Sequence, residues 1–209
     1  MDISAMTSTD TRALADEAAV TRVIRLERFL RDQGNWEALA ACYVADSCVR
    51  TTWFLGTGAE FAEASRVMAA NGRHSKHMIW PAIVRVNGDR ALSESPAAIL
   101  NRSVIDGFEV DMVQWCRFFS RLVRTAEGWR LASFEGIYQK DEIRPVWPGE
   151  QLPDSWRPEI LPFRESYRVW AWAMERRGYQ VNRELLGDDR PDLLTAFYTE
   201  EERWLADLG

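Results

Sequence analysis

Residues 76–138 read KHMIWPAIVRVNGDRALSESPAAILNRSVIDGFEVDMVQWCRFFSRLVRTAEGWRLASFEGIY. This run reads as strands, and three dipeptides that end in glycine interrupt it. Asn87–Gly88 and Asp106–Gly107 supply the positive φ that tight hairpins need, and Glu127–Gly128 makes a third turn. The sequence therefore predicts a meander of four long strands, at 76–86, 90–104, 109–124 and 129–138.

Three helices are predicted before this meander. Residues 11–32 carry apolar residues at helical spacing, and Gly34 ends the helix. Asn35 caps a short second helix that runs to Asp46–Ser47 and has four residues on one face: Trp36, Leu39, Ala40 and Tyr43. Residues 48–54 read as a strand.

The third helix begins with a capping box. Thr57 is followed by Glu60, so each side chain satisfies the other's free backbone N–H. The helix is expected to stop at Asn71–Gly72. Helices first and strands later are typical of an α+β fold. We expect a strongly curved sheet wrapped around the long first helix, forming a cone with one open mouth.

The composition changes from residue 139 onward, because five of the eight prolines fall in the stretch that follows. This stretch is predicted to be an extended strap with little regular structure. A helix carrying Tyr167 and Trp170 follows it and stops at Gly178, and 191–207 is a last amphipathic segment. The domain prediction is a disordered tail at 1–10, a cone at 11–149 and a strap with helical extension at 150–209.

Composition limits the partners. The net charge of -6 argues against nucleic acid, whose phosphates would be repelled. No leader or membrane-spanning run is evident, so we expect a cytoplasmic protein without a membrane partner. Three irregularly spaced cysteines, Cys42, Cys48 and Cys116, favour free core thiols over disulfides or zinc. No nucleotide-binding or serine-hydrolase motif is present.

Four stretches in this order resemble SnoaL-like proteins of the nuclear-transport-factor-2-like superfamily: FLRDQGNWEALAACYVADSCVRTTW (29–53), SKHMIWPAIV (75–84), NGDRAL (87–92) and EGWRL (127–131). The resemblance covers about residues 15–149. Within that superfamily, cofactorless lyases such as scytalone dehydratase, bile-acid 7α-dehydratase and hexachlorocyclohexane dehydrochlorinase pair an Asp at the end of the first helix with a His entering the sheet. Asp32 and His77 match these two places, and Glu94 matches the acidic residue of the bile-acid enzyme.

The resemblance implies acid–base catalysis without a metal or organic cofactor. A histidine titrates near neutrality, and a carboxylate on its far ring nitrogen fixes the tautomer. The structural alternative is that Asp32 caps the turn at Gly34 and that His77 is an ordinary strand residue. His74 and His77 would lie on opposite faces of a strand, so no metal site is expected. Glu94 either faces the interior as an acid or pairs with an arginine.

A pocket of aromatic side chains is expected, because the chain has ten tryptophans. The substrate-binding candidates are Tyr43, Trp53, Trp80, Arg117, Phe118 and Tyr138. Arg117 could bind an oxyanion, although pairing with a neighbouring strand's carboxylate is commoner. Tyr138 could donate to a substrate oxygen or reach the rim.

The first hypothesis is a lyase that eliminates water or formaldehyde from a bulky, largely aromatic alcohol or diol. A looser likeness to sphingomonad diarylpropane lyases makes a lignin-derived substrate an option. The alternatives are an isomerase or cyclase of the ketosteroid-isomerase type, with a carboxylate base, and a non-catalytic ligand-binding domain. The resemblance also implies a homodimer or homotrimer formed through the outer face of the sheet.

Overall fold

A computed structural model describes residues 10–207. The predicted disordered tail, apart from Asp10, lies outside the described residues. Asp10 instead caps helix α2 (Thr11–Gln33), because its side chain accepts a hydrogen bond of 3.2 Å from the backbone N–H of Ala13. Gly34 adopts the left-handed conformation at a φ of 75° and ends the helix, as predicted.

The second helix is shorter than predicted. Helix α3 (Trp36–Ala40) is capped by Asn35 and makes little more than one turn. Tyr43 does not share its face, because strand β1 (Tyr43–Arg50) already begins there and pairs in parallel with β7. This tertiary pairing supplies backbone hydrogen bonds that a longer helix would otherwise make. The predicted strand 48–54 is therefore wrong in its bounds: β1 starts earlier, and a turn leads to β2 (Leu55–Gly56).

Helix α4 (Gly58–Ala70) begins with the predicted capping box. The hydroxyl of Thr57 accepts from the backbone N–H of Glu60 at 3.3 Å, and the Glu60 carboxylate accepts from the backbone N–H of Thr57 at 2.8 Å. The helix ends at Asn71, and Gly72 has a φ of 72°, as the left-handed stop requires.

The meander forms one mixed sheet of seven strands in the order β2-β1-β7-β6-β5-β3, with β4 also paired to β5. Its remaining strands are β3 (Ser75–Ile79), β4 (Ile83–Asn87), β5 (Arg90–Ile105), β6 (Phe108–Thr125) and β7 (Gly128–Pro145). Two boundaries differ from the prediction. The first strand is split between Ile79 and Ile83, because Pro81 has no N–H for the ladder. The last strand continues past Tyr138 to Pro145.

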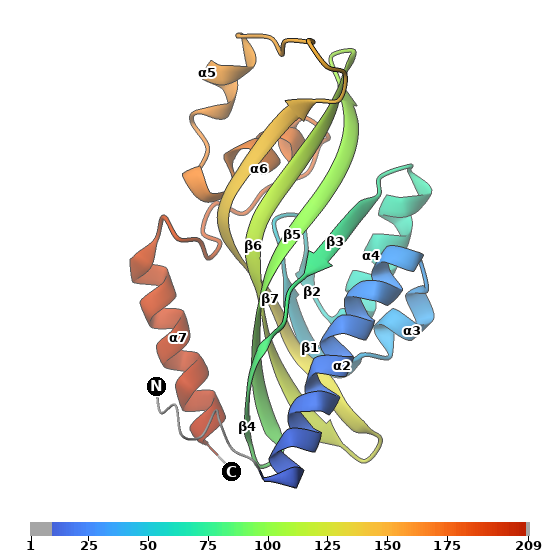
Figure 1. Cartoon of the computed structure of the whole chain (residues 1–209), viewed down its shortest axis with the longest axis vertical. Coiled ribbons are helices and arrows are strands. Elements are labelled where there is room, and N and C mark those ends of the chain that lie inside the picture. Colours follow the sequence, from blue (N-terminus) through green and yellow to red (C-terminus); the bar gives the residue numbers. More distant parts are fainter. Residues whose placement is uncertain (1–9, 208–209) are drawn as a thin grey trace.

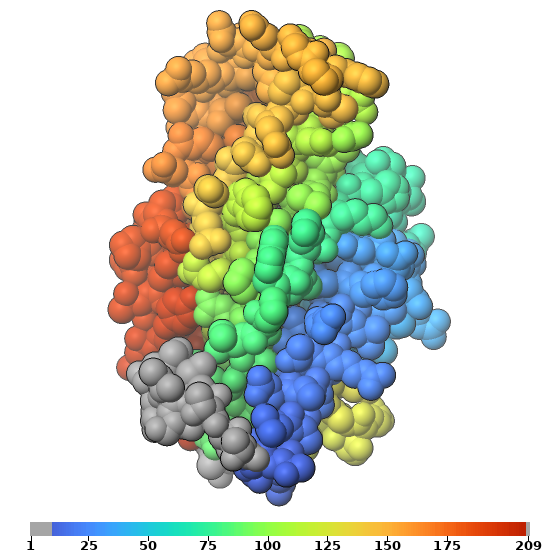
Figure 2. Space-filling view, in the orientation of Figure 1, coloured from blue at the N-terminus to red at the C-terminus, as the bar shows by residue number. Residues whose placement is uncertain are grey.

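Helices cover both faces of this sheet (Figure 1). α2 and α4 pack along one face, whereas α7 (Pro191–Ala206) covers the other. The stretch from residue 139 to the start of α7 is more regular than predicted. It contains the end of β7, α5 (Trp156–Ile160), a 3-10 turn η1 (Glu165–Tyr167) and α6 (Arg168–Glu175). Figure 2 shows the orange segment around α5 covering one end of the molecule.

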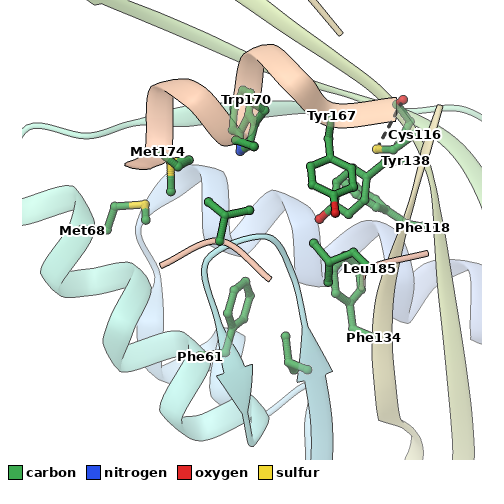
Figure 3. Packing of buried hydrophobic residues seen from close by; sticks show 14 of the residues in the cluster. Phe61, Met68, Cys116, Phe118, Phe134, Tyr138, Tyr167, Trp170, Met174 and Leu185 are labelled. Atoms are coloured by element: carbon green, nitrogen blue, oxygen red, sulfur yellow. Dashed lines mark hydrogen bonds between the residues drawn. The ribbon is translucent and has the colours of Figure 1, made fainter. Parts of the chain in front are cut away.

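The main core fills the concave side of the sheet, and α6 contributes to it (Figure 3). Trp170 and Met174 of α6 point toward side chains of α4 and of the strands, including Phe61 and Phe118. A second core lies under α7 and includes Leu92 and Phe119. The α+β prediction is confirmed: the first helix and a curved sheet form the cone, α6 packs into its core, and α7 covers the outer face of the sheet.

The three free cysteines differ in exposure. Cys42 and Cys116 are buried free thiols, but Cys48 is exposed, so the expectation of core thiols is wrong for Cys48. Within residues 10–207, no helix is both long and apolar enough to cross a membrane.

Candidate active site

Asp32 and His77 are in direct contact inside the cone. Asp32 lies in the last turn of α2 and His77 in the middle of β3, which pairs with β5 so that His77 is opposite Ile99. One carboxylate oxygen of Asp32 is 2.7 Å from Nδ1 of His77, and the other accepts the His77 backbone N–H, also at 2.7 Å. The carboxylate therefore fixes both the strand and the ring.

This contact determines the tautomer of His77. An ionised carboxylate only accepts hydrogen bonds, so Nδ1 carries the ring proton and Nε2 carries a lone pair. Burial alone would raise the pKa of Asp32, but the hydrogen bonds from His77 outweigh this effect and hold the pKa below its usual value. Lys76 helps to hold the same turn by donating to the backbone carbonyl of Asp32.

The His77 ring is a neutral base. Burial, together with the guanidinium groups of Arg31 and Arg28, lowers the pKa of His77 to about 3, although the hydrogen bond to Asp32 acts in the opposite direction. The side chain is 4% exposed. At neutral pH the imidazole is thus uncharged and able to accept a proton at Nε2.

His77 lines a small closed cavity of about 30 Å³. Three further predicted residues, Trp53, Phe118 and Tyr138, line it as well. The wall is completed by Phe61, Phe134 and Trp170, among others; Figure 3 shows these three side chains in the core that α6, α4 and the strands enclose. Burial raises the pKa of Tyr138, so its hydroxyl stays protonated; its oxygen accepts the backbone N–H of Thr52 at 3.1 Å.

Charged residues of α2 that the sequence prediction missed also lie inside the cone. Glu27, Arg28 and Arg31 are buried on the face that carries Val20 and Ile24. Arg28 pairs with Glu27, which also accepts the hydroxyl of Tyr43 at 2.7 Å. The signal was present in the sequence, because charges at helical spacing from buried apolar positions belong to the buried face.

Two predicted residues lie outside this site. Glu94 was expected on the inner face, but its carboxylate accepts from Nε of Arg117 and from the hydroxyl of Tyr198, each at 2.7 Å. Both contacts lie on the face covered by α7, opposite the face of Phe118. Arg117 also pairs with Asp188 at 3.0 Å. These charges therefore attach the C-terminal segment to the sheet, which is the ion-pair alternative.

Trp80 and Tyr43 do not line the cavity. Trp80 is partly exposed in the break between β3 and β4, with its ring 6.2 Å from that of Trp115. It lies three residues after His77, which on an extended chain places it on the other face. Tyr43 is buried deeper in the cone, where it supports Glu27.

A cone formed by a long first helix and a strongly curved sheet is the fold of the nuclear-transport-factor-2-like superfamily, which includes SnoaL-like domains. The sequence pattern of the SnoaL-like domain matches residues 12–135, which is more than half of the chain. The chain therefore belongs to the SnoaL-like family.

Two fungal proteins are similar to this chain in sequence. An uncharacterized protein of Emericella nidulans, AN9274, is 30% identical over 169 residues, covering 77% of this chain and 71% of that protein. Pea pathogenicity protein 2 of Fusarium vanettenii is 26% identical over 165 residues, covering 77% and 70%.

Solved structures share the fold. The "Putative Scytalone Dehydratase" of Novosphingobium aromaticivorans aligns with a TM-score of 0.54 at 19% identity, covering 70% of this chain and all of that one. Kfla4162 of Kribbella flavida aligns with a TM-score of 0.52 at 16% identity, covering 65% and 93%. At these identities the likeness concerns the fold.

Proposed function

We propose that this chain is a cofactor-independent lyase in which Nε2 of His77 removes a proton from a hydroxylated organic substrate. The observation that carries the proposal is the double contact of Asp32 with His77. It presents a neutral imidazole with a fixed tautomer to a closed, largely aromatic cavity. The name of the structural neighbour from Novosphingobium aromaticivorans supports the same class of reaction.

The elimination uses groups present in the cavity. His77 takes the proton of a C–H bond, the electron pair forms a double bond, and the C–O bond on the adjacent carbon breaks. The imidazolium or the hydroxyl of Tyr138 then protonates the departing oxygen, so water leaves. If His77 instead removes the proton of a primary alcohol, the oxygen's electron pair forms the C=O bond of formaldehyde and the C–C bond breaks. The carbon that keeps the electron pair of that bond then takes the proton back from the imidazolium.

The cavity wall favours a flat aromatic substrate, because half of the residues that line it carry rings. A volume of about 30 Å³ holds little more than a water molecule. Trp170 or Trp53 must therefore move before a bulky substrate enters. The isomerase alternative needs a carboxylate base in the cavity, and Glu94, its candidate, lies under α7.

The test is turnover of hydroxylated aromatic compounds by EDTA-treated protein, followed by mass spectrometry. We expect products that have lost the mass of water or of formaldehyde, and a loss of at least a hundredfold in rate for His77→Gln and Asp32→Asn. Asp46→Asn is the matched control, because Asp46 is an exposed carboxylate that lines neither the cavity nor the neighbouring groove. Turnover that is indifferent to His77 would refute the proposal.

A further inference from the structure

Arg31 is a buried cation without a carboxylate partner. Its residue is 9% exposed, and it forms no ion pair with any residue of the described chain. Its Nε is buried and has no hydrogen-bond partner within residues 10–207. An arginine taken out of water without such partners is costly unless something else satisfies it.

Arg28, one turn earlier, shows the contrast. Its guanidinium pairs with Glu27 and lies 4.3 Å from the centre of the Phe134 ring. Arg31 lies 5.5 Å from the centre of the Phe61 ring; Glu27 and Asp32 favour its charge electrostatically, but within residues 10–207 neither forms an ion pair with it. Burial and the charge of Arg28 lower the pKa of Arg31 to about 10, so it stays protonated at neutral pH. The interior therefore contains one satisfied arginine and one whose hydrogen-bond donors remain available.

Arg31 also lies where two hollows meet. It lines the cavity of His77, and it lines an open groove of about 320 Å³ between the end of α2, α4 and the start of β3. Ser75 is the other residue common to both. Arg31 and Ser75 thus form the boundary between the solvent-facing groove and the closed cavity.

The groove is predominantly basic. Arg73, His74 and Lys76 line it together with Arg31, against the single carboxylate of Asp32. The groove is also lined by Ser65, whose buried Oγ has no hydrogen-bond partner in the described part of the chain. On the cavity side, the buried Oγ1 of Thr51 is likewise without a partner there. Unsatisfied polar groups therefore occur on both sides of Arg31.

We propose that Arg31 binds the carboxylate of an anionic substrate that enters through this basic groove. The proposal rests on the proposed active site and specifies its substrate class: an aromatic or small organic acid whose hydroxyl-bearing carbon reaches His77. A guanidinium offers a planar fork of donors that matches a carboxylate. A bound carboxylate also offsets the positive charges beside His77, and this raises the basicity of Nε2 when substrate is present.

The test compares benzoate with benzamide, its neutral isostere, by isothermal titration calorimetry on the full chain. Benzoate should bind at least about tenfold more tightly than benzamide, as a charge-assisted pair predicts. Arg31→Gln should remove this preference and leave benzamide binding unchanged. Arg25→Gln is the matched control, because Arg25 is exposed on the same helix, and it should bind benzoate like the wild type.

A pH titration of the two histidine rings, followed by carbon-detected NMR, gives a second measurement on the wild type. His74→Gln assigns the signals, and benzoate should raise the apparent pKa of His77 whereas benzamide should not. This measurement decides the question if Arg31→Gln fails to fold. Equal affinity for both probes, or benzoate binding that leaves His77 unperturbed, would overturn the proposal. Neither result depends on turnover, so failure here is distinguishable from failure of the lyase proposal.

Discussion

Asp32 acts on His77 through both of its carboxylate oxygens, and this places strict demands on the end of α2. The helix must stop immediately after Asp32, so that its side chain reaches the backbone and ring of β3. Gly34 allows that stop because it adopts a φ of 75°. The same residue pair therefore orients the base and joins the first helix to the sheet.

The buried neutral imidazole should make stability depend on pH. The pKa of His77 is about 3 in the folded chain and 6.5 in the ordinary reference. Between these pH values His77 is protonated in the unfolded chain but not in the folded one. The free energy of unfolding is therefore highest above pH 6.5 and falls as the pH is lowered. The expected loss is about 1.4 kcal/mol per pH unit, or about 2 kcal/mol near pH 5.

The comparison must be with His77→Gln, because other groups titrate in the same range. Burial raises the pKa of Glu135 to about 7 and that of Asp141 to about 6, and these groups favour the folded state as the pH falls. Urea unfolding of both proteins near pH 7.5 and pH 5 isolates the histidine. A difference in unfolding free energy that stays constant with pH would show that folding does not lower the pKa of His77.

Gly58 is constrained by a close approach of α4 to β1. A Cβ at Gly58 would lie 2.1 Å from Cγ of Tyr43, whose ring is buried. Gly58→Ala should therefore lower the free energy of unfolding by roughly 2 kcal/mol or more, because the ring cannot move without disturbing Glu27. Chemical denaturation measures this, with Ala59→Gly as the control next to it. An unchanged stability would mean that the helix shifts freely.

At the scale of elements, α7 is held to the sheet by ion pairs of different burial. Glu201 is 5% exposed and makes two hydrogen bonds to Arg121, at 2.7 and 2.9 Å. Its neighbour Glu202 is 55% exposed and pairs with Arg85 at 2.6 Å. Since only the first pair is desolvated, the two should contribute differently to stability.

Glu201→Ala should cost about 2–3 kcal/mol, because it leaves Arg121 partly buried without its partner. Glu202→Ala should cost less than about 1 kcal/mol. Thermal and urea unfolding of the two variants provide the comparison. Equal costs would indicate that α7 is held by its apolar face alone.

At the scale of the whole molecule, the sheet has two buried faces. The concave face forms the cone, and the other face carries Leu92, Phe119 and Ile137 under α7. The ring of Phe197 lies 4.9 Å from that of Phe119, edge to face. α7 thus covers a face that would otherwise expose apolar side chains.

Phe197→Asp should detach α7 and cause self-association through the uncovered face. Ala196→Asp, which adds the same charge at an exposed position next to it, should remain like the wild type. Size-exclusion chromatography with light scattering measures the mass. The histidine signals should not change, because His77 lies on the other face. An unaltered mass for Phe197→Asp would show that α7 does not protect the sheet.

The sequence by itself determined the features that depend on neighbouring residues. These include the length of α2, the capping box of α4 and the hairpin turns, where Asp106 and Gly107 both have positive φ. Backbone conformation and local hydrogen bonds decide such features within a few residues. Likeness to a known family added the Asp32–His77 contact, which is present, whereas its catalytic role stays a prediction.

Only the tertiary structure decided which face of each strand is the interior. Alternation places Glu94 and Leu92 on one face, but it does not say which side helices will cover. Here both faces are covered, so Glu94 and Arg117 face α7 while Phe118 faces the cavity. Tyr43 likewise lies in a strand rather than in the predicted second helix, because β1 pairs in parallel with β7. Arg31 became a candidate anion site only because segments distant in the sequence, including α4 and β3, enclose it in the folded chain. The residues next to Arg31 in the sequence do not predict this burial.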